Sequence, residues 1–241
     1  MKTRLELIYE DAAVVVVNKP AGVLSIPDRF DTGKANLQSM LQEGYGKIWT
    51  VHRLDRETSG AILFARTEEA HKHLNAQFEA RTVDKIYLAL TDGSIYSDEG
   101  VMDKSIAPHP SQAGKMMTSS LGKQALTLYR VVERFRSFTL AEANIKTGRT
   151  HQVRVHFQSI GHPLAIDPLY GKREALALSE IKQRNFNLGK FEEEKPLMSR
   201  VTLHAAKLSF DHPDTGLRIT VEAPLHKDFQ ALLNQLRKWG K

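Results

Sequence analysis

Residues 51–65, VHRLDRETSGAILFA, join a polar loop to a buried strand, and the rest of the chain is organised around them. The loop carries one carboxylate, Asp55, between Arg53 and Arg56, and the second half, 61–65, is apolar. Loops on a rigid scaffold are where catalytic residues concentrate, and nearby positive charge favours the ionised form of a carboxylate. Asp55 is therefore a candidate catalytic group. The alternative role for it is a turn cap or a surface ion pair.

Composition places the chain among ordinary globular proteins and excludes several classes. At 241 residues it can form one large domain or two small ones with a real core. The net charge of +6 favours a polyanionic partner without naming it. The absence of cysteine excludes disulfides and thiolate chemistry. The only sustained apolar run near the start, 12–17, is too short for a signal core or a membrane span, so we expect a cytoplasmic protein with no membrane contact.

Hydrophobic periodicity predicts more strands than helices, and short turns join many of them. Strands are expected at 5–9, 14–17, 61–65, 85–91, 138–145, 151–157, 203–210 and 217–223, the last two as a hairpin. Helices are expected at 33–46, after an N-cap at Thr67, at 174–183, and at the end of the chain with Phe229, Leu232, Leu233 and Leu236 as its buried stripe. We therefore predict an α+β fold: one domain, 1–241, built on a mainly antiparallel mixed sheet with flanking helices and loops, with an insertion at 172–196.

The stretch 101–136 is predicted to be a long basic loop. Pro108, Pro110 and Gly114 interrupt regular structure there, and the stretch holds six basic residues against two acidic ones. An RNA-contacting surface is one interpretation of this charge, and a solvated loop with lysines for solubility is the other.

Two polar side chains are expected on open faces of strands. Period-two alternation puts Tyr87 on the less apolar side of the strand 85–91. The same alternation in HQVRVHF, 151–157, puts Arg154 on the polar side together with Gln152 and His156. Neither side chain is needed for a core in this interpretation, so both are candidates for substrate contact.

A catalytic metal is disfavoured by the spacing of the histidines. His151 and His156 would lie on opposite faces of a strand. His71 and His73 would lie about 200° apart around a helix. Neither pair can chelate one ion without breaking its element, and the chain has no cysteine ligands. We therefore expect no metal.

Other reaction classes lack their motifs. Ser59, in ETSGA, lacks the first glycine of a nucleophile elbow, and no G-x-x-x-x-G-K-[ST] phosphate loop occurs. A glycosidase needs a second positioned carboxylate, and beside Asp55 only Glu57 is near in sequence. What remains is one carboxylate near arginines, a tyrosine, a second arginine and positive charge. This set suits a phosphodiester-linked substrate handled without a cofactor.

Several motifs of the chain resemble those of a known family. HRLDRETSG at 52–60 resembles the signature of the RluA-type pseudouridine synthase family, and six further blocks stand in that family's order. They are NKPAG at 18–22, K-x-Y at 85–87, TGRTHQVRVH at 147–156, GHP at 161–163, LYG at 169–171 and LHAAKLSFDHP at 203–213. The resemblance covers nearly the whole chain. It implies cofactor-independent isomerisation of specific uridines to pseudouridine in structured RNA, ribosomal or transfer.

The resemblance also implies roles for single residues. It makes Asp55 the catalytic aspartate, Tyr87 the active-site tyrosine, Arg154 the basic residue that pairs with Asp55, and Arg53 the arginine that displaces the target base. An RNA-modifying enzyme must extrude its base at a cost of a few kcal/mol, and an arginine can fill the vacated stack. The same motifs add three residues expected at the RNA: His52, Arg149 and Gln152.

The chain departs from the family pattern at one place. Ala165-Ile166-Asp167 stands where the family usually has a glycine before the aspartate, so a glycine-only backbone conformation cannot be assumed there. The chain begins directly with the catalytic-domain strand, so no N-terminal RNA-binding domain is expected. We expect a monomer that binds RNA and not DNA. The competing hypotheses are a non-catalytic RNA-binding or RNA-folding factor on the same scaffold, and a nucleoside glycosylase.

Overall fold

The computed structural model describes residues 5–31, 33–182 and 193–241, and these group into two compact units. The first unit contains the described residues up to Tyr87 and His204–Pro224. The second contains Leu88–Leu203 and Leu225–Lys241. The chain passes from one to the other within strand β5, Asp84–Asp92. The single domain and the insertion expected from the sequence stay predictions, and residues 183–192 of that insertion lie outside the described residues.

The first unit is a mixed sheet with two helices. Its strands are β1 (Glu6–Glu10), β2 (Val14–Lys19), β3 (Trp49–Thr50), β4 (Ser59–Ala65), β11 (Leu203–Asp211) and β12 (Arg218–Glu222), and its helices are α1 (Leu37–Tyr45) and α2 (Glu68–Ala80). The order is β1-β2-β4-β11, with β3 beside β4 and β12 beside β11. Only the β4–β11 pair among these is parallel.

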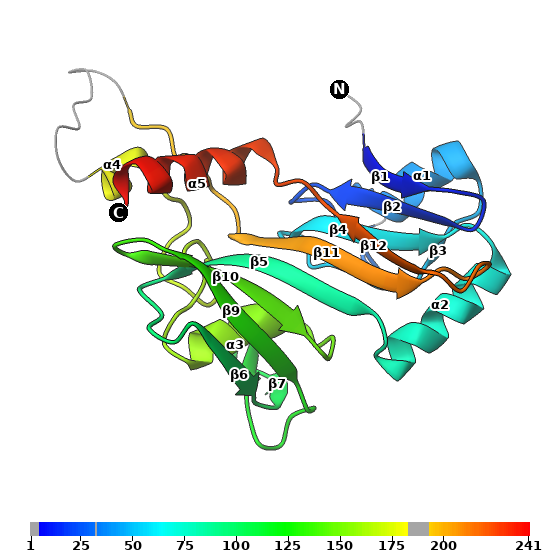
Figure 1. The fold of residues 1–241 in the computed structure, drawn as a ribbon, viewed down its shortest axis with the longest axis horizontal. Coiled ribbons are helices and arrows are strands. Elements are labelled where there is room, and N and C mark those ends of the chain that lie inside the picture. Colours follow the sequence, from blue (N-terminus) through cyan, green and yellow to red (C-terminus); the bar gives the residue numbers. More distant parts are fainter. Residues whose placement is uncertain (1–4, 32, 183–192) are drawn as a thin grey trace. The chain divides into compact units, whose positions relative to one another are not determined.

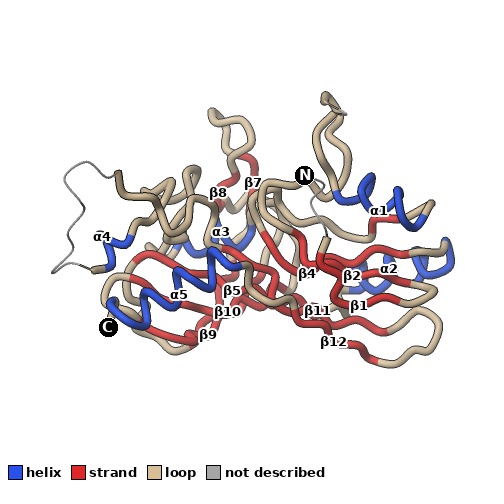
Figure 2. The backbone as a smooth tube through the Cα atoms, turned by 90° about the horizontal axis from the view of Figure 1, so that it is seen from above, coloured by secondary structure: helices blue, strands red, loops and turns tan. Residues whose placement is uncertain are grey.

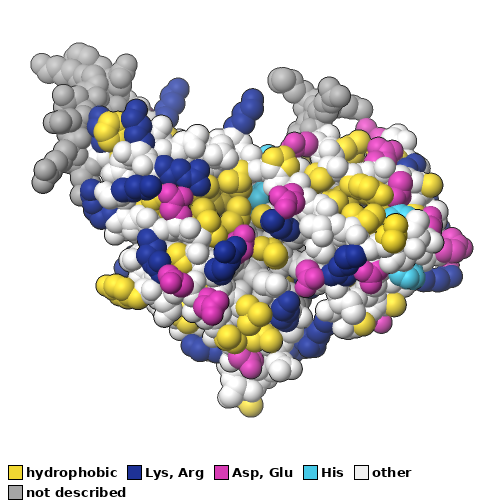
Figure 3. Space-filling view, in the orientation of Figure 1, with side chains coloured by type: hydrophobic (Ala, Val, Ile, Leu, Met, Phe, Trp, Pro, Cys, Tyr) yellow, Lys and Arg dark blue, Asp and Glu magenta, His cyan; other side chains and the backbone are white. Residues whose placement is uncertain are grey.

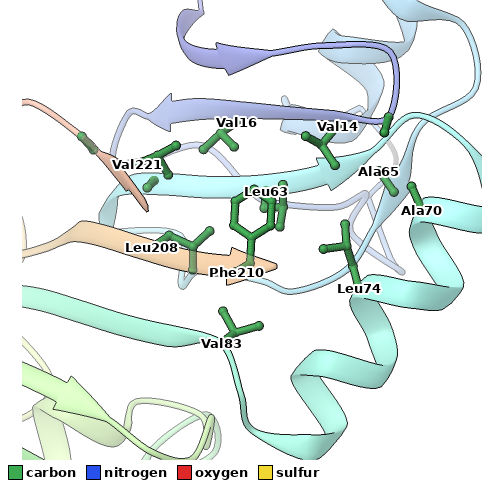
Figure 4. Packing of buried hydrophobic residues seen from close by; sticks show 13 residues of the cluster. Val14, Val16, Leu63, Ala65, Ala70, Leu74, Val83, Leu208, Phe210 and Val221 are labelled. Carbon is green, nitrogen blue, oxygen red and sulfur yellow. The ribbon is translucent and has the colours of Figure 1, made fainter. Parts of the chain in front are cut away.

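The core of the first unit is built from two fully buried strands. Every residue of β2 and β4 is buried, which explains their nearly continuous apolar runs. Figure 4 shows Val14, Leu63, Leu74 and Phe210 converging from β2, β4, α2 and β11. Helix α2 begins as predicted, because the Thr67 hydroxyl accepts a hydrogen bond from the Ala70 N–H at 3.1 Å.

The second unit contributes further strands and three helices. The strands are β5, β6 (Glu99–Asp103), β7 (Ile106–Pro108), β8 (Met116–Thr118), β9 (Leu126–Arg134) and β10 (Phe138–Ile145), and the helices are α3 (Gln152–Ser159), α4 (Leu178–Ile181) and α5 (Lys227–Trp239). The order is β5-β10-β9-β6, and β7 and β8 form a separate antiparallel hairpin. Helix α5 lies beside α4 (Figure 1), and its four predicted apolar residues are all buried in a cluster with β5 and β10.

The α+β fold with a mainly antiparallel mixed sheet is confirmed, but the strand predicted at 151–157 is wrong. This stretch forms helix α3, which begins after His151 in the left-handed region at φ 55. All six residues 152–157 are buried, polar and apolar alike. Because 152–157 are buried on every side of the helix, this part of the sequence has no polar stripe with a helical period. Its alternation therefore resembled that of a strand, and tertiary packing decided the element.

Two other predictions need correction. Instead of a long loop, 101–136 contains most of β6 and all of β7, β8 and β9. Pro108 ends β7 and Gly114 supplies a turn at φ 77, so the breakers mark the ends of short strands. The helix predicted at 174–183 is only the single turn α4 within the described residues. Among the helices in the described ranges, none is long and apolar enough to cross a membrane.

Candidate active site

The backbone on both sides of Asp55 is fastened by hydrogen bonds. Asp55 lies in the loop 51–58 between β3 and β4 and is partly exposed. The preceding Leu54 N–H donates to the Ser25 hydroxyl at 3.0 Å, and that hydroxyl donates to the Leu54 carbonyl at 2.9 Å. On the other side, the Thr58 N–H donates to the Asp55 carbonyl at 3.1 Å. The loop is therefore held in one conformation before any substrate binds.

A buried lysine holds the next residue of the loop. Lys19 is 0 % exposed, and its ammonium donates to the carbonyl oxygens of Arg56 at 2.9 Å and Pro20 at 3.0 Å. The Gly22 N–H donates to the same Arg56 carbonyl at 2.9 Å. A buried ammonium is costly unless such acceptors surround it. Neither Lys19 nor Ser25 was expected at the site, although NKPAG stands among the matched blocks and Lys19 ends a fully buried run.

His52 anchors the start of the same loop. Its Nε2 accepts the Leu63 N–H at 3.0 Å, and its ring stacks on Phe78 with centroids 4.8 Å apart. Burial, and after it the Lys85 charge, lowers the pKa of His52 to about 3. The imidazole is therefore neutral at physiological pH, with its proton on Nδ1. Through these contacts His52 helps to hold the loop in place. The RNA contact expected for it from the sequence stays a prediction.

Two arginines of the loop lie at the surface while Asp55 lies between them. Arg53 and Arg56 are both exposed. Arg56 donates from Nε to the Gly22 carbonyl at 3.1 Å and lies 3.6 Å from the Glu57 carboxylate. Its side chain thus contributes to the loop's own structure. The exposed position of Arg53 suits contact with a large partner.

Tyr87 is buried, which corrects the open strand face predicted for it. Only 9 % of the residue is exposed, on β5. Burial, and then the negative charge of Asp55, raise the pKa of Tyr87 well above its usual value. The phenol is therefore neutral. Tyr87 and Asp55 both belong to the first unit, and the charge of Asp55 acts on the Tyr87 hydroxyl. Alternation along the strand assigned the faces wrongly, because Tyr87 and Ala89 are buried whereas Ile86 and Leu88 are only partly buried.

Arg154 is a buried residue of helix α3, not an open strand residue as predicted. It is 7 % exposed, and its guanidinium donates to both oxygens of Asp167, from Nε at 2.7 Å and from Nη2 at 2.8 Å. The guanidinium carbon lies 4.8 Å from the centroid of the Tyr170 ring. This bidentate, stacked setting is one that arginine fills and lysine cannot. The pairing of Arg154 with Asp55 stays a prediction.

Gln152 and Arg149 belong to the turn before α3. The Gln152 side-chain oxygen accepts from the Thr147 hydroxyl at 2.7 Å and from the Arg149 N–H at 3.0 Å. Its amide nitrogen donates to the Leu126 carbonyl and the Thr127 hydroxyl, both at 3.0 Å. Gln152 therefore shapes the turn from inside the second unit. Arg149 is partly exposed and donates from Nε to the Gln124 carbonyl at 3.0 Å.

The residues expected at the site thus fall into two groups. Asp55, Tyr87, His52 and Arg53 lie in the first unit, and Arg154, Arg149 and Gln152 lie in the second. Asp167 and Tyr170, which hold Arg154, were not expected, although LYG at 169–171 stands among the matched blocks. In the part of the chain that the structure describes, no three or more His, Asp or Glu side chains are grouped to hold a metal ion.

Known proteins resemble this chain over nearly its whole length. The RNA pseudouridylate synthase family matches residues 13–159. Ribosomal large subunit pseudouridine synthase D of Pseudomonas aeruginosa is 40% identical over 239 residues, which cover 97% of this chain and 72% of that protein. The uncharacterized RNA pseudouridine synthase YlyB of Bacillus subtilis is 37% identical over 244 residues, which cover 98% of this chain and 74% of that protein. The solved structure of human RNA pseudouridylate synthase domain containing 1 superposes with a TM-score of 0.68 at 26% identity, covering 97% of this chain and 95% of that one.

The family match spans more than half of the chain and includes the loop of Asp55, strand β5 and helix α3. The relatives are named as synthases, which favours an enzyme over the binding-only alternative. The chain therefore belongs to the RNA pseudouridylate synthase family and is an RNA pseudouridine synthase, an isomerase.

Proposed function

We propose that this enzyme converts specific uridines of large-subunit ribosomal RNA to pseudouridine, with Asp55 as its catalytic carboxylate. The observation that supports Asp55 most directly is its loop, in which the flanking backbone groups are bonded to Ser25 and Thr58. The ribosomal substrate is supported by the names of relatives such as the Pseudomonas aeruginosa protein. We further propose that the enzyme acts as a monomer on RNA.

The reaction rearranges bonds without oxidation or reduction. The bond between uracil N1 and ribose C1′ breaks, the uracil turns, and C5 forms a new bond to C1′. The hydrogen on C5 leaves as a proton, and N1 gains one, so substrate and product are isomers. We assign the Asp55 carboxylate to the reacting sugar. A carboxylate on a pre-ordered loop avoids part of the reorganisation cost of the transition state.

Tyr87 and Arg154 are assigned to the flipped base and to the charge on Asp55. The phenol is neutral and buried, so its ring is suited to stacking on the extruded uracil. An arginine about 4 Å from a carboxylate attracts it by roughly 4 kcal/mol before desolvation is subtracted. Because Asp167 already binds Arg154 through two hydrogen bonds, the guanidinium has a defined orientation. It would act as a directed donor toward Asp55.

The remaining residues are assigned to the RNA. Arg53 is exposed on the loop of Asp55 and is proposed to fill the stack that the target base vacates. Arg149 is proposed to contact the RNA backbone, with Gln152 and His52 shaping the segments around it and around Asp55. On the face shown in Figure 3 basic and acidic side chains are interspersed, so net charge alone does not mark the binding surface there.

Release of tritium from C5 of uridine tests this function, because that hydrogen is lost only when C5 joins C1′. Ribosomal and transfer RNA carrying the label are incubated separately with wild-type protein, with Asp55→Asn, and with Asp214→Asn as a matched control at an exposed aspartate of the same unit. We expect release from ribosomal RNA by wild type and the control, and none by Asp55→Asn.

Two results would contradict the proposal. Release by Asp55→Asn at the wild-type rate would remove Asp55 from catalysis. Release from transfer RNA alone would overturn the ribosomal substrate and leave the family activity standing.

A further inference from the structure

Tyr170 touches the Arg154 guanidinium with its ring and two other segments with its hydroxyl. The guanidinium carbon of Arg154 lies 4.8 Å from the centre of the ring. The hydroxyl accepts the Met116 N–H at 2.7 Å and lies 2.7 Å from Nδ1 of His151. All four residues belong to the second unit, and Tyr170 is 4 % exposed.

The loop that carries Tyr170 is itself tied to Arg154. Asp167 is fully buried and binds the Arg154 guanidinium with both oxygens. One of these oxygens also accepts the N–H groups of Leu169 at 3.0 Å and Tyr170 at 3.1 Å. The carboxylate that fixes the guanidinium therefore also fixes the start of the tyrosine. Asp167 thus binds the edge of the Arg154 guanidinium through hydrogen bonds, and the Tyr170 ring packs against its face.

The hydroxyl of Tyr170 connects this cluster to the β7–β8 hairpin. Met116 stands opposite Pro108 in the hairpin. Its N–H donates to the Tyr170 hydroxyl. The hydroxyl oxygen accepts this bond, so its own hydrogen can be donated to His151. The loop that joins β7 and β8 projects from the body of the unit (Figure 2).

The same hydroxyl also reaches the beginning of α3. His151 directly precedes the helix, at φ 55, and its ring packs edge-on against the Tyr170 ring at 82°. Lys115, the neighbour of Met116, has its ammonium 5.8 Å from the centre of that ring. Tyr170 thus joins two segments that are distant from each other in sequence: the β7–β8 hairpin, at Met116, and helix α3, at His151 and the Arg154 guanidinium. A shift of the hairpin would move the surface on which Arg154 is stacked.

We propose that Tyr170 is a positioning residue, which holds the Arg154 guanidinium in its working orientation and links it to the β7–β8 hairpin. The proposal rests on the proposed function in that Arg154 serves catalysis. Tyr170 itself touches no substrate in this assignment.

Removal of the hydroxyl alone separates positioning from packing. In Tyr170→Phe the ring stays in place beside the guanidinium, and the hydrogen bonds of the hydroxyl to Met116 and His151 are lost. Single-turnover rate and RNA dissociation constant are measured separately, with Tyr129→Phe in β9 as the matched control. We expect the rate constant to fall about tenfold, the factor that corresponds to one ordinary hydrogen bond, with the dissociation constant within about twofold of wild type. The control is expected to match wild type in both.

A double-mutant cycle with Arg154→Lys shows whether Tyr170 acts through the arginine. Lysine keeps the charge but loses the planar fork that Asp167 and Tyr170 hold. If Tyr170 acts through Arg154, adding Tyr170→Phe to Arg154→Lys leaves the rate within about twofold of the single Arg154→Lys variant. Multiplicative losses, an unchanged rate in Tyr170→Phe, or a loss confined to RNA affinity would each overturn the proposal.

A second measurement does not depend on turnover. The Arg154 Nε–H signal in nitrogen-15 NMR is assigned by its absence from Arg154→Lys, and its exchange with water is compared between wild type and Tyr170→Phe. Faster exchange in the variant is expected, and equal exchange would overturn the positioning role. If wild type released no tritium from any RNA, the proposed function would fail while this exchange result still decided the role of Tyr170.

Discussion

Gly60 closes the loop of Asp55 and cannot carry a side chain. Its φ of 115 lies where L side chains are strained, and a Cβ there would overlap the carbonyl oxygen of Ala205. Ala205 lies directly opposite in the parallel pair of β4 and β11. The glycine at the end of HRLDRETSG is therefore required by the close approach of two strands, whatever its relation to catalysis.

Replacement of Gly60 tests this requirement. Gly60→Ala is expected to lower the free energy of unfolding by about 3 kcal/mol or more, because strain and overlap act together. Gly44→Ala in α1 is the matched control, since its Cβ would meet nothing within 4 Å. It is expected to raise stability by up to about 1 kcal/mol through helix propensity. Urea unfolding of the two variants measures both effects, and equal shifts would contradict the strand contact as the cause.

The lowered pKa of His52 predicts that the free energy of unfolding depends on pH. The folded pKa of about 3 lies below the ordinary value of 6.5, so the unfolded chain binds its proton first as pH falls. Stability from this group is present above pH 6.5 and is lost as pH falls toward 3. At most one proton is involved, which sets an upper limit of about 1.4 kcal/mol per pH unit.

The measurement compares wild type with His52→Gln, whose side-chain oxygen can still accept the Leu63 N–H. Urea unfolding at pH 7.5 and 5.5 is expected to show a larger stability loss in wild type than in the variant. Other titrating groups, such as the buried His156, are present in both proteins and cancel in the difference. Identical pH dependence would show that His52 is not held neutral.

At the scale of elements, α3 shows how a buried helix organises polar groups. Gln152 at its start satisfies two donors and two acceptors from other segments. His156 one turn later contacts the Thr127 hydroxyl at 2.8 Å and the Lys104 carbonyl at 2.9 Å. Buried polar groups need such partners, and here they connect the helix to β9 and to the segment after β6. These hydrogen bonds hold the helix, and with it Arg154, in a defined position.

Gln152→Leu is expected to destabilise the protein by about 3 kcal/mol, because several buried partners lose their hydrogen bonds together. Gln158→Leu, at an exposed position of the same helix, is the control and is expected to change stability by less than about 0.5 kcal/mol. Both variants are measured by urea unfolding, and RNA affinity is measured where both are folded. A loss of affinity without a loss of stability would make Gln152 an RNA contact instead.

At the scale of the whole molecule, the charge of +6 predicts salt-sensitive RNA binding. Each phosphate contact by a basic side chain releases counterions, so affinity falls as salt rises. Arg149→Gln is expected to lower the slope of log affinity against log salt by about one, because Arg149 is the side chain assigned to the RNA backbone. Lys72→Gln removes the same charge from the outer side of α2, where Lys72 pairs with Glu68, and is expected to leave the slope unchanged. A slope near zero in wild type would contradict phosphate binding altogether.

The sequence alone determined the fold class, most of the elements and the family. Local signals were sufficient where an element's own residues specify it, as in the Thr67 cap, the hairpin of β11 and β12, and the apolar stripe of α5. The ordered motifs were sufficient for the family because they depend on residue identity and not on contacts. The same motifs selected Asp55, Tyr87 and Arg154 as candidates.

Only the tertiary structure decided what holds those residues. Ser25 is bonded to Leu54, Lys19 to Arg56 and Asp167 to Arg154, partners separated by 29, 37 and 13 positions. It also decided that HQVRVHF is a helix and that Tyr87 is buried. The physical reason is the same in each case: periodicity and propensity report on neighbours along the chain, whereas burial and hydrogen bonding depend on segments that folding brings together.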